Sequence, residues 1–100
     1  MNEEQAKSLE AMSEDMKAIL EAAAEKGEVL ILSSDQTGKW IAAGAKDFLF
    51  QDNPALTARY YDAFLGLIRR GVLRHDEGNV YVFSSLGFNL ARKLRDRVAV

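Results

Sequence analysis

The stretch that decides the fold reads FLGLIRRGVL over residues 64–73 and, after a short turn, YVFSSLGFNLA over residues 81–91. The first segment ends an apolar helical pattern at two arginines and Gly71, and glycine is the residue type that most often follows the last turn of a helix. The chain then alternates as strands do, and two serines next offer a helix cap. We therefore predict a helix, a β-hairpin and a closing helix in this order.

Asn53 and Pro54 mark the start of the first of these helices, because asparagine caps helices and proline fits their first turn. The helix is expected to run to about Arg70. Its spacing predicts a core stripe of Leu56, Tyr60, Ala63, Phe64, Leu67 and Ile68. The residues expected on its outer face include Thr57, Arg59, Tyr61 and Asp62.

The amino-terminal half predicts another helix and another hairpin. Apolar residues recur at helical spacing through the first 26 residues, with Ser8 and Ser13 as alternative caps and Gly27 as the stop. The expected strands span residues 28–33, 39–43, 72–74 and 80–83, and the closing helix spans residues 86–97. The result is one small α+β domain over residues 1–100, with residues 1–12 as an N-terminal helical extension.

Composition excludes several classes of function. The chain has 100 residues, 48% of them apolar and 28% charged, as expected for one globular domain. It has no cysteine and a single histidine, His75, so zinc sites and catalytic triads lack their residues. Thr37 to Lys39 lack the flanking residues of a phosphate-binding loop. We expect no enzyme activity, no metal and no cofactor.

The sequence also bears on location. The longest apolar run, from Val29 to Leu32, is too short to span a membrane. The acidic start lacks the apolar segment of a secretion signal. We therefore expect a cytoplasmic protein without membrane contact.

Charge is divided unevenly along the chain. Residues 1–53 carry five lysines, no arginine and eleven acidic residues, a net charge of −6. Residues 54–100 carry seven arginines, one lysine and four acidic residues, a net charge of +4. Two interpretations remain open. The basic half binds nucleic acid, or the two halves pair with each other within one molecule or across a dimer.

The deciding stretch resembles the winged-helix family over residues 60–95. Many members end a helix with two apolar residues, two polar residues and glycine, form a short wing, and continue through an aromatic strand into a closing helix. Residues 13–35 fit the opening helix and first strand of the family. Residues 35–52, where the family has a second helix, read as a strand and a loop, so the helix-turn-helix is degenerate.

The resemblance implies a DNA-binding protein, a small transcriptional regulator acting as a dimer, whose recognition helix spans residues 53–70. Outward residues at the start of that helix would face double-stranded DNA, and cations of the helix ends and the wing would contact phosphates. The implied nucleic-acid residues are Thr57, Arg59, Tyr61, Arg69, Arg70, Arg74, His75, Arg92 and Lys93. The alternative is a protein-interaction module that keeps the fold without DNA readout.

A homodimer has its own candidate residues. Tyr61 and Leu65 lie one helical turn apart on the expected outer face, and the N-terminal extension offers Leu9 and Met12. A second signal lies in the last strand. Its valines at positions 80 and 82 alternate with aromatic residues, so one of these two pairs faces outward unless something covers it. Either a partner or the long N-terminal helix is the cover.

Overall fold

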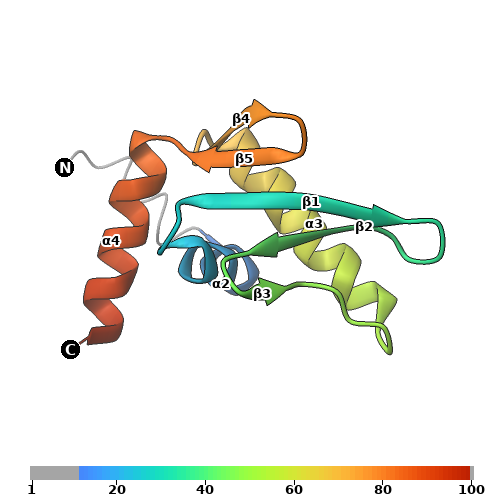
Figure 1. The fold of residues 1–100 in the computed structure, drawn as a ribbon. Coiled ribbons are helices and arrows are strands. Elements are labelled where there is room, and N and C mark those ends of the chain that lie inside the picture. Colours follow the sequence, from blue (N-terminus) through green and yellow to red (C-terminus); the bar gives the residue numbers. More distant parts are fainter. Residues whose placement is uncertain (1–11, 100) are drawn as a thin grey trace.

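The protein is described by a computed structural model over residues 12–99, with side chains as far as Asp96. It is a small α+β domain (Figure 1). Its elements are α2 (Glu14–Ala23), β1 (Glu28–Ser34), β2 (Gly38–Ala43), β3 (Lys46–Asp47), α3 (Pro54–Arg69), β4 (Leu73–Glu77), β5 (Val80–Phe83) and α4 (Ser85–Ala99). The predicted order of helix, hairpin, central helix, second hairpin and closing helix is confirmed, and the short strand β3 is an addition.

The five strands form one antiparallel sheet in the order β3-β2-β1-β5-β4. The central strand β1 pairs with β2 from Val29 to Ser34, and with β5 through residues 28–30. Asn79 extends the second pairing, because its side-chain amide donates to the carbonyl of Ile31 at 2.8 Å. The second hairpin is thereby fixed to the first.

Helices α2 and α3 cover one face of the sheet, and α4 packs across its end against α2 and β5 (Figure 1). The core between helices and sheet includes Val29 and Ile41 from the strands, and Ile19, Phe64 and Leu67 from the helices, all fully buried. Phe48, which follows β3, is fully buried as well. The sheet therefore has one face covered by helices and one face that these helices leave open.

Each described helix begins at a polar cap. The side chains of Ser13, Asn53 and Ser84 accept hydrogen bonds from the backbone three residues later. A capping side chain satisfies one of the free N–H groups of the first helical turn. Of the two caps weighed for the first helix, Ser13 serves α2, while Ser8 lies outside the described residues. Helix α2 ends at Ala23, three residues earlier than predicted.

Two glycines allow close packing between elements. A side chain at Gly66 would meet the methyl group of Met16, so α2 lies directly against α3 at this point. Gly44, in the turn between β2 and β3, has a φ of 60° and faces the backbone carbonyl of Ala22. Only glycine combines this backbone conformation with such a close approach.

Candidate functional site

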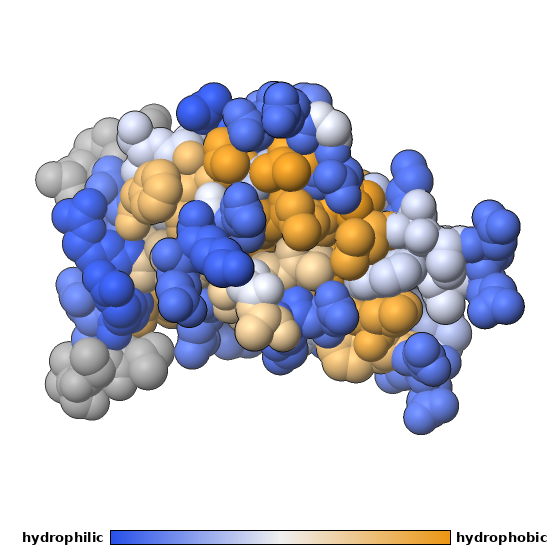
Figure 2. Space-filling model, in the orientation of Figure 1, coloured by the Kyte–Doolittle hydropathy of each residue, from blue (hydrophilic) through white to orange (hydrophobic). Residues whose placement is uncertain are grey.

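The open face of the sheet carries a continuous apolar surface, which we call the open-face patch. It is made of Leu30, Leu32, Trp40, Ala42, Val80 and Val82, all half-buried. Their register partners share this face, since side chains alternate along a strand. None of the six belongs to the core cluster or to the residues packed against it. Figure 2 shows the resulting hydrophobic band over β5, β1 and β2.

The two faces of β5 have different surroundings. Tyr81 and Phe83 turn toward the helices, where Tyr81 meets the ring of Phe64 edge-on at 5.1 Å. Val80 and Val82 face away from them. In the described part of the chain, the N-terminal helix α2 covers the other face and leaves the two valines uncovered.

Charged residues lie around the open-face patch. Arg74 pairs in register with Val82, and Glu77 with Val80, so both lie on β4 at the same edge of the patch. Asp47 on β3 and Glu28 on β1 bound it on other sides. An apolar centre within a charged rim is the usual anatomy of a protein-binding surface.

The edges of the sheet are poor sites for pairing with another strand. Strand β3 has only two residues. Strand β4 carries four exposed polar or charged residues and a bulge between His75 and Glu77. Short, charged and bulged edge strands resist pairing with foreign strands. The face of the sheet, rather than its edge, is therefore the surface available to a partner.

Trp40 lies on the open face, opposite Leu32 in the register of β1 and β2. It belongs neither to the helix-covered core nor to the residues packed against that core. Its indole N–H is shielded from solvent and has no acceptor among the described residues. Because Trp40 is the single tryptophan of the chain, its fluorescence reports on this surface alone.

Thr57 does not lie where the winged-helix resemblance implies. It is 6% exposed, and its hydroxyl accepts a hydrogen bond from the backbone N–H of Phe50 at 2.8 Å. The segment after β3 folds over the first turns of α3 and covers this position. The outward placement of Thr57 is therefore wrong, and its side chain holds the loop against the helix.

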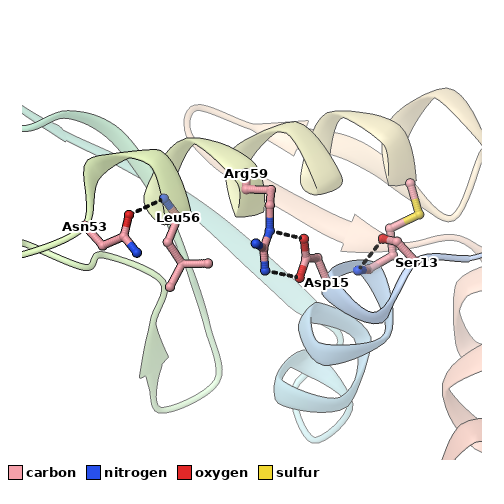
Figure 3. Close-up of polar contacts among 6 residues, drawn as sticks. Ser13, Asp15, Asn53, Leu56 and Arg59 are labelled. Atoms are coloured by element: carbon pink, nitrogen blue, oxygen red, sulfur yellow. Dashed lines mark hydrogen bonds and ion pairs between the residues drawn. The ribbon is translucent and has the colours of Figure 1, made fainter.

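Arg59 is engaged by an acidic partner on α2. Its guanidinium donates from Nε and Nη2 to the two carboxylate oxygens of Asp15, at 2.8 and 3.2 Å (Figure 3). Hydrogen bonding to Asp15, together with its charge, raises the pKa of Arg59 above its ordinary value. The ion pair joins α3 to the start of α2 and supports the interpretation that the acidic and basic halves pair within one molecule.

The other predicted cations do not gather on one surface. Arg74 lies on the open face of the sheet, whereas Arg59 lies in the helix layer on the opposite side. Arg92 lines a small hollow beside Ala24, at the far end of α2 from Asp15, and a ten-residue helix spans about 15 Å. Helix periodicity does not fix how separate elements are oriented, so it could not predict this dispersal.

His75 and Lys93, two further residues expected to contact phosphate, are instead held within the domain. The His75 ring donates from Nε2 to the carbonyl of Gly78 at 2.9 Å and packs on Tyr81, so it stabilises its own turn. Lys93 is half-buried, and its ammonium has neither solvent contact nor a partner among the described residues. In this arrangement Lys93 does not reach a phosphate. Arg69 and Arg70 are exposed at the end of α3.

The helical dimer surface predicted from the sequence is largely occupied. Met12 is 4% exposed and belongs to the core, so it offers no free edge. Tyr61 and Leu65 are half-buried and pack against the core cluster. Leu9 lies outside the described residues. The best-exposed large apolar side chain described is Phe88 on α4, at 52%, which packs edge-on against Phe83.

Comparisons with models of known protein families, with curated proteins and with solved structures give no match. Within residues 12–99, no three side chains of the metal-binding types come together as a cation site. No helix in this same range has the length and apolar character needed to cross a bilayer.

One sequence signal anticipated this surface. Four apolar residues run without interruption from Val29 to Leu32. A strand covered on one face alternates, whereas an uninterrupted apolar run indicates a strand that is covered on both faces. In β1 the helices cover one set of these side chains, and the other set forms the centre of the open-face patch.

Proposed function

We propose that this chain is a cytoplasmic protein-interaction domain that associates with a second copy of itself through the open-face patch. The observation that carries the proposal is the patch itself, six contiguous apolar side chains in the middle of a sheet, left uncovered by every described helix. Exposed apolar surfaces rimmed by charge are typical of protein interfaces. In this proposal the chain shares the fold of winged-helix proteins but does not read DNA.

The rim charges support a second copy as the partner. Arg74 and Glu77 carry opposite charges at neighbouring positions of one edge of the patch. A two-fold axis that passes between them, parallel to the face and across the strands, sets each Arg74 opposite the Glu77 of the other copy. The same axis brings Val80 of each copy to Val82 of the other. Such a self-complementary surface is what a symmetric dimer requires.

Sedimentation velocity over a wide range of protein concentration tests the proposal. The sedimentation coefficient is expected to rise from the monomer value to that of a dimer. The emission of Trp40 is expected to shift to shorter wavelength over the same range, because the partner removes water from the patch. A monomer at all concentrations, with unchanged emission, would overturn the proposal.

Charge reversal tests the orientation of the dimer. Arg74→Glu and Glu77→Arg each place like charges opposite one another, whereas the double variant restores two attractive pairs. Rim ion pairs are worth about 0.2–1 kcal/mol each and the dimer contains two of them, so each single variant is expected to weaken the dimer at least roughly 2- to 30-fold. The double variant should recover most of this loss in sedimentation equilibrium. If the double variant dimerises no more tightly than the single variants, the dimer has another orientation.

DNA binding is the second candidate function, and the exposure of Arg69, Arg70 and Arg74 favours it, since none of the three forms an ion pair with another described residue. If the chain binds DNA, its affinity for a mixed-sequence duplex is expected to fall steeply between 50 and 200 mM salt. Arg70→Ala should reduce the salt slope by about one, and Arg92→Ala serves as the matched control. Unchanged fluorescence anisotropy of a labelled duplex at low salt would exclude it.

A further inference from the structure

A cleft opens at the end of the molecule formed by the β1–β2 turn, the loop after β3 and the first turns of α3. Its volume is about 380 Å³, which is within the range of pockets that hold small molecules. Gln36 and Lys39 line it from the hairpin, Phe50 from the loop, and Pro54 and Ala58 from the helix. The cleft lies on the helix side of the sheet, because Lys39 shares the strand alternation of Ile41.

The walls of the cleft are held in place before any ligand arrives. The Thr57 hydroxyl accepts from the N–H of Phe50, and the N–H of Asn53 donates to the carbonyl of Phe50 at 2.9 Å. The Phe50 ring also stacks on Tyr60, with 5.6 Å between ring centroids. On the hairpin, the Ser34 hydroxyl accepts from the N–H of Thr37 at 3.0 Å. A ligand would therefore pay little for ordering this loop.

The lining has an apolar side and a polar side. Leu49, Phe50 and Pro54 provide the apolar wall, and Gln36 faces it from the hairpin with Lys39. Lys39 is the single charged residue among the described lining, and it forms no ion pair with another described residue. A cation beside an apolar wall matches a ligand that has an anionic head and an apolar body.

We propose that this cleft binds a small carboxylic acid with an apolar body, its carboxylate at Lys39 and its apolar part against Leu49, Phe50 and Pro54. The proposal concerns a different part of the molecule from the open-face patch and does not depend on self-association. A ligand here would contact the hairpin, the loop and α3 together.

Backbone amide chemical shifts recorded during titration with 4-phenylbutyrate test the proposal, with neutral 4-phenylbutanamide as the matched probe. Saturable shifts are expected in residues 36–39 and 49–58 with the acid, and much weaker ones with the amide. Lys39→Gln should weaken binding of the acid about two- to fivefold, since Lys39 is exposed and ion pairs of exposed lysines are weak. Lys46→Gln, at an exposed lysine of the neighbouring strand, should leave it unchanged.

Ala58→Phe, which fills the cleft from an exposed helix position, is expected to abolish binding while the circular dichroism spectrum stays that of the parent chain. Equal binding of acid and amide, or equal loss in the Lys39 and Lys46 variants, would overturn the assignment of the ligand class. Absence of saturable shifts with either probe at millimolar concentration would overturn the site.

Discussion

Val82→Asp is expected to abolish self-association. Position 82 lies within the open-face patch, so a dimer would bury the new carboxylate among apolar side chains. An unpaired charge in such an environment costs several kcal/mol. The dissociation constant should therefore rise by about two orders of magnitude or more, and sedimentation velocity should show a monomer throughout the concentration range.

The isolated monomer should tolerate this change. Val82 is half-buried and nothing covers the open face in the monomer, so water can reach the new carboxylate there. Ser33→Asp is the matched control, because Ser33 is exposed on β1 and shares its register with Lys39 on the other face. If Val82→Asp sediments as the parent chain does while the control is also unchanged, the patch is not the interface.

Gly44→Ala is expected to destabilise the fold strongly. Gly44 has a left-handed φ of 60°, and an added side chain would meet the backbone carbonyl of Ala22. The unfavourable backbone conformation costs about 1 kcal/mol, and the steric conflict adds about 1–3 kcal/mol because a backbone group yields little. Urea denaturation should show a free energy of unfolding lower by about 2–4 kcal/mol.

Gly38→Ala measures the backbone part of this effect by itself, so the difference between the two variants gives the steric part. Gly38 has a similar φ of 73°, but no atom lies within 4 Å of the added side chain. It should cost only the backbone term, about 1 kcal/mol. Equal losses in the two variants would mean that α2 does not press on the β2–β3 turn.

Local sequence signals were sufficient for the order of the elements. Asn53 and Pro54 start α3 as predicted, and Gly71 follows its end. A glycine with positive φ follows the turn of the first hairpin at position 38, and another lies in the turn of the second hairpin at position 78. Caps, turns and periodicity act over a few residues, so a single sequence carries them in full.

Caps, turns and periodicity could not predict the candidate site, because it depends on contacts between residues far apart in the sequence. Arg59 is exposed as helix periodicity predicts, but it meets Asp15 across 44 positions of sequence, a contact that local signals do not contain. Thr57 is buried by a loop whose path has no periodicity. The alternation of β5 identified two candidate faces, and only the position of the helices decided that Val80 and Val82 are the open pair.

The central position of β1 has a consequence for the synthesis of the chain. This strand is made early, and its first neighbour β2 follows at once, but its other neighbour β5 ends at Phe83. The first hairpin, complete at Ala43, must therefore wait for 40 further residues before its second flank is paired, and pairing across such a separation slows folding. Until then the edge of β1 that pairs with β5 has no partner, and unpaired strand edges make a nascent chain prone to aggregation.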